Sequence, residues 1–264
     1  MTLLCFSLLG VISGVISGLL GVGGGIIIIP GLLMIFHYEG FHSPILMHLA
    51  VATSFAVMVP TTIRSFMAHR KQGIDVSSLI RLFLPALITG VVIGAIAAHF
   101  IHSHILRVMF SVFLLLLSVQ MLAPNQLALS YSLSTVIARV AGFFIGLLSS
   151  MIGVSGSTFT TPLLLGAGMD IREVMSVSIS VGIVVSCCST FLYAFTGLHA
   201  SGMPPHSLGY IYWPAALSMS IMTLAFAPLG VRLSHKLPRE LLRKLFAVLL
   251  AVIALHGLWA LFAL

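Results

Sequence analysis

Two stretches of the sequence indicate how the rest of the chain is organised. Residues 10–30 read GVISGVISGLLGVGGGIIIIP, and residues 142–162 read GFFIGLLSSMIGVSGSTFTTP. A shift of 132 positions aligns them without a gap and matches Gly10, Gly14, Gly21, Gly24 and Pro30 with Gly142, Gly146, Gly153, Gly156 and Pro162. Three other glycines of the first stretch are replaced by Ser150, Ser155 and Ser157. This self-similarity predicts that the chain consists of two copies of one unit.

Each stretch predicts a helix, a break and a short second helix. Gly10, Gly14 and Gly18 share one helix face, which lets another backbone approach closely within lipid. The cluster Gly21–Gly25 interrupts the helix, because glycine loses the most backbone entropy on ordering. The amides freed at such a break must face a cavity or a ligand, and a new helix start favours an anion. The alternative is that the glycines serve close packing alone.

The composition is that of a membrane protein. Hydrophobic residues make up 59% of the chain, charged residues 6%, and the mean hydropathy is +1.20, whereas soluble domains carry about 25% charged residues. The net charge of +7 does not indicate nucleic-acid binding, because the basic residues sit mostly in loops. We expect Met1–Leu20 to be retained rather than cleaved as a signal peptide. The cysteines, Cys5, Cys187 and Cys188, lack metal-ligand spacing, so we expect neither a metal site nor a cofactor.

We predict an all-α polytopic membrane protein made of two inverted-topology repeats of about five segments each. The first repeat covers 1–122, a cytoplasmic linker covers 123–133, and the second, inverted repeat covers 134–264. The apolar segments are 3–20, 25–37, 44–68, 79–101, 104–122, 134–152, 157–168, 173–196, 207–231 and 240–263. Crossing the hydrocarbon core takes about 20 residues. The sequence therefore leaves open whether 25–37 and 157–168 span the membrane or re-enter.

The orientation follows from the basic loops, since cytoplasmic loops are enriched in lysine and arginine. Loops 69–78 and 232–244 carry such residues and are predicted to be cytoplasmic, which places both termini outside. Equivalent loops of the two halves then fall on opposite faces. Inverted repeats with interrupted helices are the architecture of many secondary transporters.

Two motifs resemble those of a known family. The run Gly21–Pro30, followed by Ala52-Thr53-Ser54, resembles the TauE/SafE family of sulfite exporters, also called the toluene sulfonate uptake permease family. The weaker run Gly153–Ser157 is typical of the same family. The resemblance implies a bacterial inner-membrane protein that transports a sulfur-containing anion such as sulfite, a sulfonate or sulfoacetate.

We therefore predict a secondary transporter that works by alternating access at the interface of the two repeats. The five acidic residues all fall in or beside the predicted loops, and an acid-free interior suits an anionic substrate. The expected partners are membrane lipid and that anion, and a homodimer is left open. The alternatives are an anion channel, a membrane scaffold, or a carrier for another small solute such as a cation. An intramembrane enzyme is disfavoured, because the chain lacks a His-Glu-x-x-His motif, an intramembrane aspartate pair and a Ser–His arrangement.

The candidate substrate-binding residues lie at the two breaks and in the third segment of each half. At the breaks they are Gly23, Gly24, Gly25, Ile26, Ser155, Gly156, Ser157 and Thr158. In the third segments they are Thr53, Ser54, Ser178 and Ser180. If the third segments are regular helices, their hydroxyls will instead bond to carbonyls of the preceding turn.

Three further residues are candidates for a charge or proton role: His48, Arg64 and Arg139. An ionisable residue within the membrane is a functional suspect. Each of these, however, is predicted near the end of its span, where a side chain can also snorkel to the interface or serve structure alone.

Overall fold

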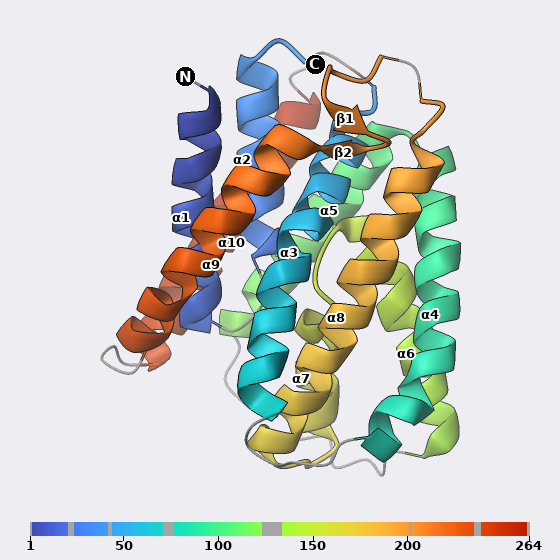
Figure 1. The fold of residues 1–264 in the computed structure, drawn as a ribbon. Helices are drawn as coiled ribbons and strands as arrows, with labels where there is room; N and C mark the ends of the chain where they lie inside the picture. Colours follow the sequence, from blue (N-terminus) through green and yellow to red (C-terminus); the bar gives the residue numbers. More distant parts are fainter. Residues whose placement is uncertain are drawn as a thin grey trace.

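The described part of the chain is helical apart from one short hairpin. The computed structural model describes residues 2–20, 24–41, 44–70, 77–122, 134–200, 202–234 and 239–262. Its helices are α1 (Thr2–Leu20), α2 (Gly25–Tyr38), α3 (Leu46–Arg70), α4 (Ser77–Phe100), α5 (Ser103–Leu122), α6 (Thr135–Ile152), α7 (Ser157–Gly166), α8 (Ile171–Thr196), α9 (Trp213–Ser234) and α10 (Arg239–Phe262). The strands are β1 (Ser207–Leu208) and β2 (Ile211–Tyr212) (Figure 1).

Eight of these helices are long and apolar enough to cross a membrane, so the chain is a multi-pass membrane protein. The exceptions are α2 and α7, with 14 and 10 residues. At about 1.5 Å per residue they extend for about 21 Å and 15 Å, which is less than the hydrocarbon thickness of about 30 Å.

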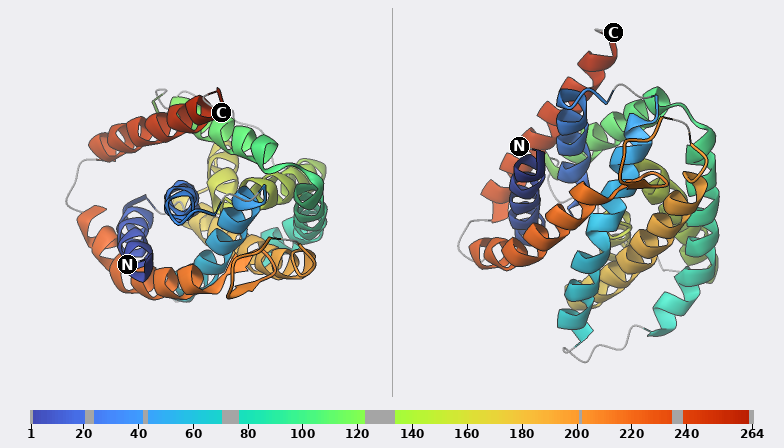
Figure 2. Two further views of the ribbon diagram at one scale, coloured as in Figure 1. Left: turned by 90° about the horizontal axis from the view of Figure 1, so that it is seen from above. Right: turned by 45° about the horizontal axis from the view of Figure 1, so that its top comes forward.

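The short helix α2 folds back along α1. Phe6, near the start of α1, contacts Phe36, near the end of α2, with ring centroids 6.0 Å apart. The two helices therefore form an antiparallel pair. The start of α1 and the end of α10 lie at the same end of the bundle, the upper end in Figure 1 (Figures 1 and 2).

Glycines bring two pairs of helices into backbone contact. In the α1–α9 pair, a Cβ at Gly18 would collide with the carbonyl oxygen of Ala227. In the α4–α6 pair, a Cβ at Gly146 would collide with the carbonyl oxygen of Leu87. The prediction that these stripes admit a close backbone is confirmed. Glycines on the partner helices, such as Gly230 of α9, complete the contact and were not anticipated.

The helices α3 and α8 cross at the centre of the molecule and run antiparallel. Toward one end, the Phe55 and Tyr193 rings stack with centroids 6.1 Å apart. Toward the other end, the hydroxyls of Thr62 and Ser186 lie 3.2 Å apart. The pair α5 and α10 flanks this centre, and the two helices contact each other.

The apolar segment predicted at 207–231 is not one helix, because its first residues form the β1–β2 hairpin. Ser207 pairs with Tyr212 across this hairpin. Gly209 has φ 56°, a left-handed conformation that glycine adopts without steric cost. Pro214 lies in the first turn of α9, where its missing N–H costs no hydrogen bond. Hydropathy alone could not separate this hairpin from the helix that follows it.

Candidate functional site

The second break is a short non-helical segment between α6 and α7. Gly153 ends α6 in a left-handed conformation with φ 82°. Its N–H and that of Val154 both donate to the carbonyl of Ser149, at 2.9 and 3.2 Å. Helix α7 begins at Ser157 after Gly156. The chain reverses within these few residues and presents the serines of the motif to the interior.

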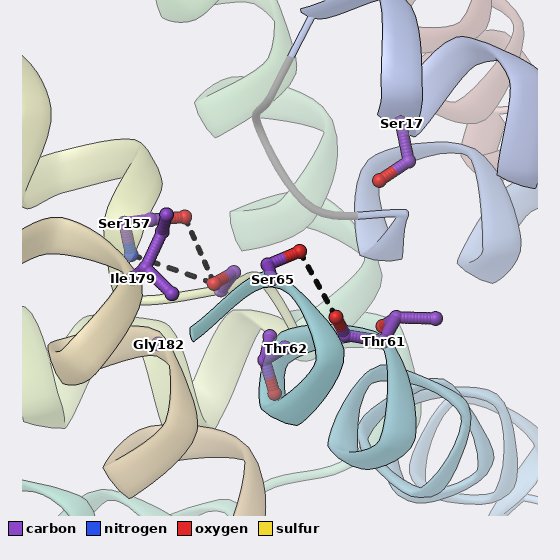
Figure 3. Close-up of a pocket in the computed structure, with 8 residues that line it drawn as sticks. Ser17, Thr61, Thr62, Ser65, Ser157, Ile179 and Gly182 are labelled. Carbon is purple, nitrogen blue, oxygen red and sulfur yellow. Dashed lines mark hydrogen bonds between the residues drawn. The ribbon is translucent and has the colours of Figure 1, made fainter. Parts of the chain in front are cut away.

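A polar pocket opens beside this break. It has an empty volume of about 400 Å³ including its mouth. Its lining residues come from α1, α3, the break and α8: Ser17, Thr61, Thr62, Ser65, Ser155, Ser157, Ile179 and Gly182 (Figure 3). Six of these eight carry a hydroxyl, and none of the eight is charged. The hydroxyls of Thr61, Thr62 and Ser65 donate to carbonyls of their own helix, so the lining is polar without fixing a charge in the pocket.

The two serines of the break form part of the polar wall of the pocket. The hydroxyls of Ser155 and Ser157 lie 3.0 Å apart, and both side chains are buried. Gly182 of α8 faces them, and a Cβ at this position would lie 2.9 Å from Ser155 Oγ. A side chain at position 182 would therefore occupy the space that keeps the Ser155 hydroxyl accessible.

The first backbone amides of α7 are largely engaged, contrary to our expectation that they are free for an anion. The N–H of Thr158 donates to the carbonyl of Ser155 at 3.0 Å, and that of Phe159 donates to the carbonyl of Gly156 at 3.3 Å. The N–H of Ser157 donates to Ser155 Oγ at 3.4 Å. The serine hydroxyls, rather than these amides, are the donors that the pocket offers.

The start of α2 lies against the second break. A Cβ at Gly25, the first residue of α2, would lie 2.7 Å from the carbonyl oxygen of Gly153. Ser54 of α3 donates to that same oxygen at 3.3 Å and to the carbonyl of Val51 at 2.7 Å. The structure thus brings both motifs and the third segment of the first half together, while Gly23 lies outside the described residues.

Other residues at the breaks serve packing. Ile26 is 1% exposed and belongs to the apolar core. A Cβ at Gly156 would lie 2.8 Å from both Val181 and Val185, so this glycine seats the start of α7 on α8. Gly24 precedes α2, and Thr158 is buried beside the pocket without lining it.

Three predicted hydroxyls point away from the pocket. Thr53 Oγ1 accepts from the N–H of Tyr212 at 3.1 Å and so anchors the hairpin. Ser178 accepts from Thr161 of α7 at 3.0 Å. Ser180 donates to the carbonyl of the preceding turn at 2.8 Å. Only the Ser180 contact is the bond to a preceding-turn carbonyl that the alternative of a regular helix predicts.

His48 joins three elements at the end of the bundle opposite the pocket. Its Nε2 lies 2.8 Å from the carbonyl oxygen of Ala98, and its Nδ1 lies 3.2 Å from Ser103 Oγ. The ring also stacks on Tyr210, whose hydroxyl pairs with His99 Nδ1 at 3.0 Å. Burial raises the pKa of the Tyr210 hydroxyl, so this group stays protonated at neutral pH.

The two candidate arginines differ in position. Arg64 of α3 donates to the carbonyl of Leu224 in α9 at 2.8 Å. Within α9 that carbonyl lacks its usual donor, because the residue four positions later is Pro228. Arg64 therefore fastens α3 to α9, immediately next to the pocket residue Ser65. Arg139 lies exposed on α6 and does not line the pocket.

The pocket contains residues that the sequence did not single out, chiefly Ser17 and Gly182. Ser17 lies within the glycine stripe, where it reads as one more small packing residue. Gly182 follows the alternating serines of α8, and it has no side chain that would mark it as a binding residue. Only the crossing of α1, α3 and α8 brings these positions to one place.

The apolar spans, with an uncharged polar pocket between them, define a multi-pass helical membrane protein. Residues 6–257 match the family described as Sulfite exporter TauE/SafE. The chain is 31% identical over 256 residues to a "Probable membrane transporter protein" of Haemophilus influenzae, covering 96% of this chain and 97% of that protein. It is 28% identical over 260 residues to "Probable membrane transporter protein MJ0441" of Methanocaldococcus jannaschii, covering 95% and 93%. It is also 22% identical to "Probable membrane transporter protein YunE" of Bacillus subtilis, over 96% of each chain.

The chain belongs to the TauE/SafE sulfite exporter family and is a membrane transporter. The resemblance drawn from the two glycine motifs is thereby confirmed over nearly the whole chain.

Proposed function

We propose that the protein is a secondary transporter that carries a small sulfur-containing anion, of the sulfite, sulfonate or sulfoacetate class, by alternating access. The observation that carries this proposal is the hydroxyl-lined pocket at the second break. Both halves of the chain contribute to it: Ser17, Thr61, Thr62 and Ser65 from the first, and Ser155, Ser157, Ile179 and Gly182 from the second.

The chemistry of the pocket suits such an anion. A sulfite or sulfonate group has three oxygens that accept hydrogen bonds, and Ser155 and Ser157 offer two adjacent donors. Among the described lining residues there is no carboxylate to repel the anion. These residues include no lysine or arginine either, so none of them holds the anion in a buried ion pair, and this favours release on the far side.

The arrangement of the helices supports two inverted repeats, 1–122 and 134–264. If α1–α5 correspond in order to α6–α10, the close pair α1–α9 corresponds to the close pair α6–α4. The corresponding helices α3 and α8 run antiparallel, as inversion of one half requires. The predicted linker, 123–133, lies outside the described residues.

We further propose that the pocket opens toward the cytoplasm in this structure, and that both termini face outward in a bacterial inner membrane. Ser65, an exposed lining residue, lies near the end of α3 that leads into the basic loop 69–78. Arg64 beside it would attract an anion to the mouth. At the opposite end, Tyr212 packs against Phe6, Phe36 and Phe41 with centroids 5.7–5.9 Å apart. One closed end favours a carrier over a continuous pore.

The proposal is tested by thermal stabilisation of the purified protein with sulfite, thiosulfate, sulfoacetate and taurine. A ligand at one hundred times its Kd adds about 2.7 kcal/mol to the free energy of unfolding. We expect at least one of these anions to raise the Tm of the wild type, and the rise to shrink in Ser155→Ala/Ser157→Ala. No stabilisation by any of the four would contradict the proposal.

A further inference from the structure

The strongest helix contacts in the molecule join helices from different halves of the chain. Helix α9 packs along α1, and α4 packs along α6. Helix α3 contacts α2 and α9, while α8 contacts α7 and α4. Helix α3 also contacts α8 extensively. With that contact taken as the boundary between two groups, the others sort eight helices into a first bundle of α1, α2, α3 and α9 and a second bundle of α4, α6, α7 and α8. Each bundle thus holds three helices of one half and one helix of the other.

We propose that these two bundles, and not the two sequence repeats, are the rigid bodies that move against each other during transport. The inference rests on the proposed alternating-access function and specifies which helices move together. On this assignment α9 moves with the first half of the chain and α4 moves with the second half. The α5–α10 pair lies beside both bundles.

The first bundle is held together by backbone contact. A Cβ at Gly230 of α9 would collide with the carbonyl oxygen of Val15 in α1. The hydroxyl of Thr223 donates to the carbonyl of Gly10 at 3.2 Å and lies 3.4 Å from Ser13 Oγ. Helices in such close contact cannot slide past each other without separating, because each carbonyl occupies the place of a missing side chain.

The second bundle is fastened in the equivalent way. A Cβ at Gly90 of α4 would collide with the carbonyl oxygen of Phe143 in α6. Within the same bundle, the Tyr193 hydroxyl of α8 donates to the carbonyl of Ser150 in α6 at 2.9 Å. That carbonyl lies in the last turn of α6, where carbonyls lack a backbone N–H donor from their own helix. The Tyr193 hydroxyl supplies the donor instead.

The pocket lies on the boundary between the bundles. Its lining divides evenly, with four residues from α1 and α3 and four from the second break and α8. Ser65, which is exposed, lies at one end of it. At the opposite end of the molecule the bundles are joined by His48 of α3, which bonds to the carbonyl of Ala98 in α4 at 2.8 Å. A rocking motion that released this end and closed the Ser65 end would expose the pocket to the opposite face.

A buried serine fits this motion. Ser17 lines the pocket, and its counterpart in the second repeat, 132 positions later, is Ser149. Ser149 Oγ is fully buried and has no hydrogen-bond partner in the described part of the chain. In this state Ser17 lines the pocket. After the bundles rock to the other state, Ser149 lines the pocket in its place, from the second repeat.

Two cysteine pairs in a variant lacking Cys5, Cys187 and Cys188 separate bundle motion from repeat motion. Ser13→Cys/Thr223→Cys joins the two repeats but lies within the first bundle, with the native oxygens 3.4 Å apart. Thr62→Cys/Ser186→Cys joins the two bundles, with the native oxygens 3.2 Å apart. Both pairs are buried and matched in distance, but Thr62 also lines the pocket, so each oxidised pair is compared with its own reduced form and not with the wild type.

We expect the oxidised 13/223 pair to transport sulfite at the rate of its reduced form, and the oxidised 62/186 pair to transport more slowly than its own reduced form until a reductant is added. Loss of transport on oxidation of the 13/223 pair, restored by reductant, would overturn the bundle assignment. Unchanged transport by the oxidised 62/186 pair would also overturn it. If neither the wild type nor the reduced variants transport sulfite, the proposed function fails. The assignment of helices to the two bundles is then decided by measuring distances between spin labels.

That measurement uses spin labels at exposed positions on nanodisc-embedded protein. Leu8 of α1 and Ile221 of α9 lie in one bundle but in different repeats. Leu8 and Ile93 of α4 lie in one repeat but in different bundles. All three are exposed. Rigid bundles predict a narrow 8/221 distribution and a broad or two-peaked 8/93 distribution; the reverse pattern, or equally narrow distributions, would overturn the assignment.

Discussion

Replacing Ser157 by alanine tests the pocket at a single atom. In this structure the Ser157 hydroxyl bonds to Ser155 Oγ at 3.0 Å. On anion binding it would exchange this neutral hydrogen bond for one to a charged oxygen. The fold should survive the substitution, because Ser155 Oγ still accepts from the backbone N–H of residue 157 at 3.4 Å and is not left without a partner.

The magnitude follows from the exchange. A neutral hydrogen bond contributes about 1 kcal/mol net, and one to a charged group about 1.5–3 kcal/mol. The difference is about 0.5–2 kcal/mol, which corresponds to a rise in Kd of about 2- to 30-fold. We expect Ser157→Ala to show this rise in a calorimetric titration with the best ligand of the anion panel, with little change in Tm of the ligand-free protein.

Ser180→Ala is the matched control. Ser180 is also buried, but its hydroxyl donates to Ser176 within α8 and does not line the pocket. Its Kd should equal that of the wild type. An unchanged Kd in Ser157→Ala and also in Ser155→Ala, or an equal loss in Ser180→Ala, would refute the reasoning and favour a packing role for the serines of the break.

Three further expectations follow. Gly182→Ala should weaken the binding of sulfoacetate more than that of sulfite, because its methyl would lie 2.9 Å from Ser155 Oγ and narrow the pocket; an unchanged ratio of the two Kd values would contradict this. Gly18→Ala should destabilise the protein by about 1–3 kcal/mol through overpacking against α9, measured as a lower Tm, and a wild-type Tm would show that the helices separate without cost. A cysteine introduced by Lys71→Cys or Lys236→Cys should resist an impermeant thiol reagent added to intact cells, and efficient labelling would reverse the assigned orientation.

The sequence predicted those parts of the fold that depend on local composition and periodicity. Glycines four residues apart predicted the close approach of a second helix at Gly18. The prediction needs no knowledge of the partner helix, because a helix face without side chains admits the backbone of any helix that packs against it. Hydropathy located the long helices to within a few residues. It missed the β1–β2 hairpin, because Tyr210 and Ile211 are as apolar as a helical segment, and only the left-handed Gly209 reveals the turn.

The candidate site was predicted in part. Ser155 and Ser157, which the repeat marks as departures from glycine at a helix break, line the pocket, and their part in binding stays a prediction. Ser178 was misplaced toward the pocket, because the face that a serine of α8 presents depends on how α8 crosses α3. Gly182 could not be found from the sequence, since its contribution is the absence of a side chain opposite residues that are distant in the chain.

Counterflow in proteoliposomes tests the central claim most directly. Purified protein is reconstituted, loaded with unlabelled sulfite and diluted into radiolabelled sulfite, with Ser155→Ala/Ser157→Ala as the pocket variant and Ser180→Ala as the control. A carrier with its site at the second break predicts saturable uptake that internal sulfite accelerates, wild-type rates in the control, and a rise in the half-saturating concentration in the pocket variant. Uptake no faster than in empty liposomes, or an unchanged half-saturating concentration in the pocket variant, would contradict it.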